Sequence, residues 1–236
     1  MLSFFFYLNN GNPSSAQKRE IKKWFWHTAL GERYSGGAFA RNVAKDITFF
    51  EKLANKENGK YIVDEKINPN ELLKKEYSKT NQSAVIGYYL FLRASRPKYL
   101  ETGEPLILDN ALALSNRKDK HHIFPRALLN RKKIKTKWNN SILNICFLAA
   151  NENQAISDDK PSNYLGEYKR KRHFVTVMKS HLLPAGSDSG VWKDNLRHGF
   201  KLLLNQRAMR ILNSLSKVTG VEKHKLLERF EEIKRV

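Results

Sequence analysis

Two adjacent histidines, followed by two asparagines, are the residues in this sequence best suited to carry out chemistry. His121 and His122 precede Ile-Phe-Pro, and Asn144 and Asn153 follow within and after an apolar run. A histidine is largely neutral near pH 7 and can accept a proton from water. A second imidazole and an amide oxygen can bind a divalent ion. A base and a cation together are what metal-assisted hydrolysis of a phosphodiester requires.

The spacing around these residues predicts a small strand–strand–helix unit. Pro125 should end or bend a strand just after the histidines and expose them at its rim. Residues 142–148 contain neither Gly nor Pro and predict a second strand, and Asn153 should lie in the first turns of the next helix. Adjacent residues in a regular strand point to opposite faces, so both histidines can face one ion only where the strand twists or ends.

The charge balance predicts a polyanionic partner. The 236 residues include 43 Lys and Arg against 23 Asp and Glu, a formal net charge of +20. Such an excess favours nucleic acid, because each neutralised phosphate releases counterions. A generally basic protein, or one that binds ribosomes or membrane surfaces, is the alternative. A single cysteine, Cys146, excludes an internal disulfide and a cysteine-based zinc site, and its apolar surroundings predict a buried, inert thiol.

Basic side chains surround the histidine motif, and more follow on a later helix. Those in residues 131–137 should form a loop between the two strands, beside the histidines. A solvated surface is the alternative, but contact with the nucleic-acid backbone is favoured next to such a motif. The residues predicted to bind nucleic acid are Lys120, Arg126, Arg131, Lys132, Lys133, Lys135, Lys160, Lys169 and Arg170.

The remaining chain is predicted to be mainly helical. Apolar residues recur at helical spacing, and the breaks contain Gly, Pro or Ser. Residues 82–94 are the most apolar segment and should be the core of the first half, with their aromatic side chains packed inside. The other predicted helices cover 14 or 15 to 30, 38–55, a short stretch near 69, 151 onward with an interruption at 158–161, 166–183, 193–217 and 221–236.

The motif residues resemble a known family of nucleases. The blocks HHIFPRALL and LNICFLAANENQAISDDKPSNYL look like the HNH nuclease domain at the C-terminus of GmrSD-like, modification-dependent restriction enzymes. KWFW at 23–26, ERYSGG at 32–37 and the helices after Pro184 extend the likeness over nearly the whole chain. The resemblance implies a ββα-metal fold, DNA cleavage and a role in restriction or defence against phage.

Residue by residue, the resemblance assigns the roles. His122 takes the position of the general base, and His121 and Asn153 take those of the metal ligands, with Asn151 as the alternative to Asn153. Asn144 would brace the loop and orient His122. Lys160 and its neighbouring proline fall on the family's trailing Lys-Pro. The implied cofactor is one divalent metal ion, Mg²⁺ or Mn²⁺.

The sequence departs from the family pattern in two respects. An acidic residue often precedes the family's catalytic histidine, and here it is His121, which leaves a metal site without formal charge. Asp119 is a candidate substitute or supporting partner. The Asp-Gly-Gln-Arg-like motif of the family's N-terminal nucleotide-using domain is absent, as is a P-loop. That function could belong to a separately encoded recognition subunit.

These observations predict an α+β, mostly helical fold with an HNH core embedded between helical segments. The expected parts are a helical domain at 1–105, the nuclease core at 106–183 (its catalytic part about 108–168) and a closing helical segment at 184–236. The N-terminal apolar stretch is too short for a signal peptide or a membrane span, so a cytoplasmic location without membrane contact is expected. The alternatives are a non-catalytic DNA-binding or assembly subunit of a defence complex and an RNA-directed nuclease.

Overall fold

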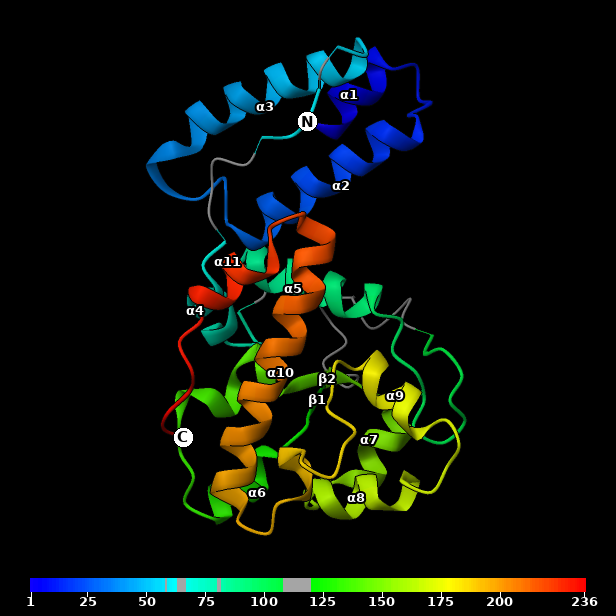
Figure 1. Cartoon of the computed structure of the whole chain (residues 1–236), viewed down its shortest axis with the longest axis vertical. Coiled ribbons are helices and arrows are strands. Elements are labelled where there is room, and N and C mark those ends of the chain that lie inside the picture. Colours follow the sequence, from blue (N-terminus) through cyan, green and yellow to red (C-terminus); the bar gives the residue numbers. More distant parts are fainter. Residues whose placement is uncertain (58, 63–66, 80–81, 108–119) are drawn as a thin grey trace.

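A computed structural model describes residues 1–57, 59–62, 67–79, 82–107 and 120–236 of the chain. In this part of the chain, helices and short 3-10 turns accompany one antiparallel pair of strands. The predicted mostly helical α+β class is therefore confirmed. In Figure 1, α1, α2 and α3 form a smaller group at one end, and the other elements form a larger body.

The smaller group consists of α1 (Leu2–Leu8), α2 (Ser15–Leu30) and α3 (Phe39–Ala54), with a 3-10 turn, Gly36–Ala38, before α3. Ser14 and Gln17 form a capping box at the start of α2. The Ser14 hydroxyl accepts from the Gln17 N–H at 3.2 Å, and the Gln17 side chain accepts from the Ser14 N–H at 2.8 Å. Because these bonds satisfy N–H groups left open at a helix start, the predicted helix from 14 or 15 to 30 is confirmed.

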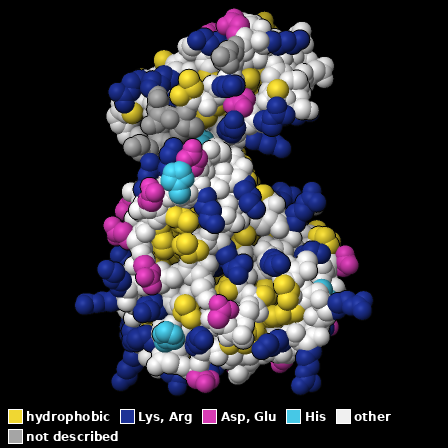
Figure 2. Space-filling model, in the orientation of Figure 1, with side chains coloured by type: hydrophobic (Ala, Val, Ile, Leu, Met, Phe, Trp, Pro, Cys, Tyr) yellow, Lys and Arg dark blue, Asp and Glu magenta, His cyan; other side chains and the backbone are white. Residues whose placement is uncertain are grey.

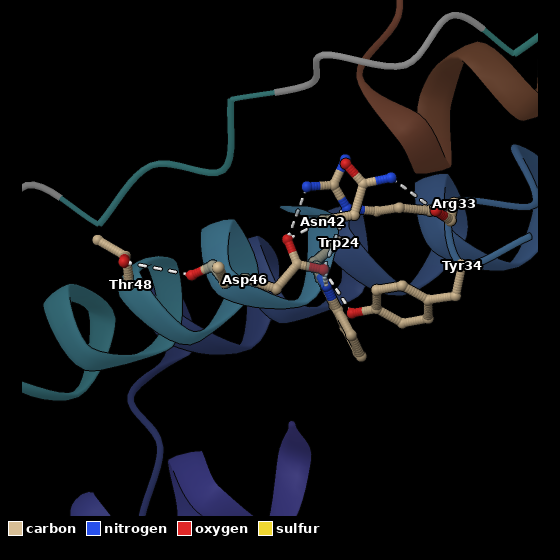
Figure 3. A network of polar contacts seen from close by, with 7 residues as sticks. Trp24, Arg33, Tyr34, Asn42, Asp46 and Thr48 are labelled. Atoms are coloured by element: carbon tan, nitrogen blue, oxygen red, sulfur yellow. Dashed lines mark hydrogen bonds and ion pairs between the residues drawn. The ribbon is translucent and has the colours of Figure 1, made fainter. Parts of the chain in front are cut away.

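A buried carboxylate, Asp46, connects α3 to α2 and to the turn between them, as Figure 3 shows. Arg33 donates to both carboxylate oxygens at 2.9–3.2 Å. Trp24 donates from Nε1 at 2.8 Å, and the Tyr34 hydroxyl donates at 2.5 Å. Burial of the hydroxyl, followed by its bond to Asp46, raises the pKa of Tyr34. A buried charge is tolerated when it is fully paired, so this network fixes how the two long helices cross.

Two further helices, α4 (Pro69–Lys74) and α5 (Ser83–Ala94), lead from the smaller group into the body. Asn68 caps α4, its side chain accepting from the N–H groups of the first turn, and Pro69 follows at the first helical position. In α5, Tyr88 and Phe91 are buried in the main core. The predicted short helix near residue 69 and core helix at 82–94 are confirmed.

The sheet consists of β1 (Lys120–His122) and β2 (Ile145–Phe147). Between them lie α6 (Arg126–Arg131) and the 3-10 turns η2 (Lys137–Asn140) and η3 (Ile142–Asn144). The second strand is thus shorter than predicted, because η3 occupies its first three residues. The predicted loop between the strands is also partly wrong, since Arg131 ends a helix there. Cys146 lies buried in β2, where burial raises the pKa of its thiol to about 12.

After the sheet come α7 (Ala150–Ile156), α8 (Pro161–Tyr168) and α9 (Phe174–Ser180). The interruption predicted at 158–161 is confirmed, but the continuous helix predicted over 166–183 is wrong. Leu165 and Phe174 are both buried. Nine residues apart on one straight helix, they would point to opposite faces. The break between α8 and α9 lets both side chains turn toward the core.

The longest helix, α10 (Leu196–Thr219), runs along the whole body in Figure 1. A 3-10 turn, η4 (Gly190–Trp192), precedes it, and α11 (Lys223–Glu228) follows. The prediction of helix to residue 236 is wrong beyond α11. There the backbone of Ile233 pairs with the Asn205 side chain, accepting at 3.0 Å and donating at 2.8 Å. These bonds hold the tail extended against α10 instead of allowing another helical turn.

Buried side chains form two clusters. The smaller one, which includes Phe5, Trp24 and Phe50, belongs to the first three helices together with Tyr61. The larger one joins the sheet to α10 and also includes Leu72, Leu73 and the buried apolar side chains of α5. The first 105 residues therefore contribute to both clusters; the predicted domain limits stay a prediction. None of the helices in the described ranges is long and apolar enough to cross a membrane.

The burial of His181 predicts that the folded protein is less stable at acidic pH. It is 3% exposed, and its Nε2 lies 2.8 Å from the Lys98 carbonyl oxygen. Burial lowers the pKa of His181 to about 4, against about 6.5 in an unfolded chain. Between these pH values the unfolded chain takes up a proton at His181 and the folded protein does not. The free energy of unfolding therefore has its full value above pH 6.5 and decreases as the pH falls toward 4. Over this pH range His181 lowers the free energy of unfolding by on the order of 3 kcal/mol.

The measurement is urea unfolding at pH 7, 6 and 5. His181→Gln should show a weaker pH dependence than the wild type, and His224→Gln, at an exposed position, should show none of this change. Equal pH dependence in all three proteins would contradict the prediction.

Candidate functional site

The two strands place the histidines at the centre of the body. Lys120 pairs with Phe147, His121 with Cys146 and His122 with Ile145. The Ile123 N–H continues the pairing to the Asn144 carbonyl oxygen at 2.8 Å. Because successive strand residues alternate in direction, the two imidazoles meet different surroundings.

His121 is almost wholly buried, with an exposed fraction of 3%. Its Nδ1 lies 2.6 Å from Oδ1 of Asn153, and the ring packs edge-on against Tyr164 with 5.7 Å between ring centres. No described group forms a hydrogen bond with its Nε2. Burial lowers the pKa of His121 to about 4, although the bond to Asn153 acts in the opposite direction. The imidazole is therefore neutral at pH 7.

His122 is half-buried and faces different residues. Its Nε2 lies 3.3 Å from Oδ1 of Asn140, and its ring packs edge-on against Tyr77 at 5.0 Å. Burial lowers the pKa of His122, and the nearby positive charge of Arg126 acts in the same direction. This histidine is also neutral at pH 7, and it is the more accessible of the two.

Asn144 braces the turn that follows the histidines. Its Oδ1 accepts from the Phe124 N–H at 2.9 Å, and its Nδ2 donates to the carbonyl oxygens of Phe124 and Asn139 at 3.0 Å each. The side chain is fully buried, and these three bonds use both its oxygen and its amide protons. They fix the segment after His122 to the segment that carries Asn140.

Asn153 reaches His121 from the first turns of α7, as the sequence predicted for a helix after the second strand. Asn151, the alternative, is exposed. The adjacent Glu152 is buried, and its Oε1 accepts from the Glu101 N–H at 3.1 Å. Burial raises the pKa of Glu152. This carboxylate ties the start of α7 to the loop before the sheet and so helps to place Asn153.

Sequence reasoning missed three residues of the site. Asn140 stands two residues before the second apolar run, which was a usable signal. Tyr164 lies on α8, where its hydroxyl donates to the Ile123 carbonyl oxygen at 2.7 Å. Tyr77 lies far upstream. Its N–H donates to the Asn140 carbonyl oxygen at 2.9 Å, the Ile142 N–H donates to the Lys75 carbonyl oxygen at 2.9 Å, and this pairing brings Tyr77 to His122. No local pattern could have indicated Tyr77.

The His121–Asn153 pair fits the donor set expected for a divalent ion. Nδ1 of His121, on the strand, contacts Oδ1 of Asn153, on the helix. The other nitrogen of the same ring, Nε2, has no hydrogen-bond partner among the described residues. Imidazole nitrogen and amide oxygen are both ligands of divalent ions. Both side chains are uncharged, so phosphate and water would have to complete the coordination. The described residues contain no group of three or more His, Cys, Asp and Glu side chains at metal spacing. Asp119 lies outside the described residues.

Some of the predicted nucleic-acid-binding residues contact other side chains of the protein, and the others face solvent. Four interact with other side chains: Lys120 and Lys169 lie over the rings of Tyr89 and Trp192, at 4.5 and 4.6 Å, Arg131 pairs with Asp158, and Lys160 lies 3.9 Å from Asp194. The remaining five are exposed: Arg126, Lys132, Lys133, Lys135 and Arg170. Arg126, the nearest of these to His122 in the sequence, also acts on it electrostatically.

Comparison with known proteins gives one distant relative and assigns no family. No family model matches the sequence, and no solved structure matches it significantly. The chain is 23% identical over 237 residues to a protein of Methanocaldococcus jannaschii described as "Uncharacterized protein MJ0686". The match covers 91% of this chain and 39% of that protein, so the chain spans about two fifths of its relative's length.

Asn144→Ala should destabilise the protein by about 2 to 4 kcal/mol, because it leaves three buried backbone groups without a partner. The measurement is urea unfolding at pH 7. Asn163→Ala is the matched control, since Asn163 is exposed and its side chain bonds to Asp159 at the surface. A loss below 1 kcal/mol at Asn144 would show that the brace is dispensable.

Proposed function

We propose that this protein is a metal-dependent endonuclease of the HNH type that hydrolyses DNA phosphodiester bonds. The observation that carries the proposal is the contact of His121 on β1 with Asn153 on α7, 2.6 Å apart. These are the two residues to which the family resemblance assigns the metal. Asn144, between them in the sequence, bonds to the turn after β1, which supports the bracing role that the resemblance implies.

His122 is the proposed general base. A base must be neutral at working pH, and burial lowers the pKa of His122 accordingly. If Asn140 Oδ1 accepts its bond, Nε2 carries the proton and Nδ1 has the free lone pair. Nδ1 then accepts a proton from water as the water attacks phosphorus. Asn140 and the ring of Tyr77 keep the imidazole from turning away.

His121 and Asn153 would hold the divalent ion, Mg²⁺ or Mn²⁺. When bound, such an ion offsets the negative charge that develops on the phosphate and on the leaving 3′ oxygen. The low pKa of His121 keeps a nitrogen lone pair available at neutral pH. Products would carry 5′-phosphate and 3′-hydroxyl ends.

The wider role follows from the resemblance. Restriction of foreign or phage DNA in the cytoplasm is proposed, with recognition supplied by a separate nucleotide-using subunit. The net charge of +20 and the exposed cations of residues 126–135 support DNA as the polyanion. RNA remains the alternative substrate for the same chemistry.

A second candidate is a non-catalytic DNA-binding or assembly subunit. The burial of His121 favours it, because an imidazole that is 3% exposed and bonded to Asn153 is poorly placed to meet an ion from solvent. His122, moreover, bonds to Asn140 rather than facing that pair. Incubation of the purified chain with plasmid and Mg²⁺, Mn²⁺ or Ni²⁺, with EDTA as control, separates the two. Absence of nicking with every metal would favour the subunit.

His122→Ala should reduce cleavage of plasmid DNA at least about 100-fold and leave DNA affinity nearly unchanged, because it removes the base without removing a cation at the surface. His224→Ala, at an exposed position on α11, should cleave like the wild type. Substantial cleavage by the His122 variant would show that another group is the base.

The exposed lysines after α6 should contact phosphates. Replacing Lys132, Lys133 and Lys135 by Gln should lower the slope of log affinity against log salt by about one for each lost contact. Single-turnover cleavage of saturated DNA should change little, because the site residues are intact. The measurement is binding at several salt concentrations beside cleavage at saturation. An unchanged slope would show that this surface is only solvated, and Lys169 and Arg170 would then be tested.

A further inference from the structure

The end of the chain and the start of α10 enclose a pocket whose described lining contains basic residues and no acidic residue. Its volume is about 460 Å³, and Asn195, Arg197, His198, Lys201, Lys234 and Arg235 line it together with Val236. Four of these side chains carry a full positive charge at pH 7. None was singled out by the sequence motifs.

Specific bonds hold this pocket in shape. Asn205 pairs with both the N–H and the carbonyl oxygen of Ile233, at 2.8 and 3.0 Å. Arg197 donates to the Val236 oxygen at the other end of the tail. Lys234 and Arg235, between these two anchors, are exposed. The tail is therefore fixed to α10 at two points, which place the backbone of Lys234 and Arg235 between them.

The pocket adjoins the exposed lysines after α6. Nη2 of Arg197 donates to the Lys133 carbonyl oxygen at 3.4 Å. Figure 1 shows the C-terminus beside the green segment that contains α6, and in Figure 2 Lys and Arg side chains gather along the lower left margin of the body. The pocket thus extends the basic surface formed by Lys132, Lys133 and Lys135.

We propose that this pocket binds backbone phosphates of a nucleic-acid strand that continues past the lysines after α6. The lining side chains include several cations and no carboxylate, so these cations repel one another, and a phosphate relieves that repulsion while releasing counterions. The pocket offers no pattern for reading bases, so the contact adds affinity and orientation without sequence preference. The inference rests on the proposed action on nucleic acid but not on cleavage.

The test compares two variants with matched controls in EDTA, where metal-dependent cleavage cannot occur. Lys201→Gln, Lys234→Gln and Arg235→Gln together should lower the salt slope of duplex DNA binding by about two to three. Lys18→Gln, Lys22→Gln and Arg41→Gln remove the same charge from exposed positions on α2 and α3 and should leave the slope unchanged. An equal decrease in both would overturn the proposal, because net charge alone would explain it.

Asn205→Ala tests whether the pocket is a formed site. It removes the bonds to Ile233 and leaves every charge in place, so DNA affinity should fall severalfold. Asn213→Ala, on the same helix, should not change it. Unfolding midpoints verify that both variants are folded. Unchanged affinity for Asn205→Ala would overturn the proposal, even if the triple variant binds weakly.

Two further arms separate the sources of the anion. Inorganic phosphate should compete with DNA only at millimolar concentration, and vesicles with anionic lipid should bind the wild type and the triple variant equally. A triple variant that loses vesicle binding but keeps the DNA slope would overturn the proposal in favour of a membrane surface. Failure of cleavage with every metal, with the slope change intact, would contradict the nuclease proposal alone.

Discussion

The buried amide of Asn144 is the constraint on which the rest of the site depends. Two strands of three residues each cannot hold their own geometry, because they offer few ladder bonds and expose edges on both sides. Asn144 supplies what the sheet lacks by joining the turn after His122 to the segment before β2. From the other side, Arg207 of α10, itself fully buried, donates to the Leu143 carbonyl oxygen at 2.6 Å. The long helix thereby secures the same turn from behind.

Burial lowers the pKa of both histidines, but their surroundings differ. His121 lies in the interior against Tyr164 and Asn153, and its low pKa follows from loss of water. His122 has a partly open position and a cation, Arg126, close by. Desolvation disfavours a charged imidazole in both places. One side chain is suited to an internal pairing, and the other to exchanging a proton with solvent.

Cationic side chains in the interior and on the surface have different roles. Arg33 and Arg207 are buried and bonded to fixed oxygens, and they serve the architecture. The lysines after α6 and the tail cations Lys234 and Arg235 are exposed and lie in two adjoining stretches. A protein of net charge +20 repels itself, and such repulsion is relieved where a polyanion binds. Asn205 holds the backbone of Ile233 against α10 and thereby places the neighbouring Lys234 and Arg235 at this surface.

The sequence by itself predicted most of the helices, the cap at Ser14, the mostly helical class and the places of His121 on a strand and Asn153 on the following helix. These depend on apolar spacing and on local bonds such as the capping box at Ser14, which neighbours in the sequence can form. Tertiary structure decided the rest. The break between α8 and α9, the extended tail beside Asn205 and the approach of Tyr77 to His122 arise from contacts between distant segments. The alternation of a strand turned the two histidines to different partners, because a backbone in that conformation leaves adjacent side chains no common face.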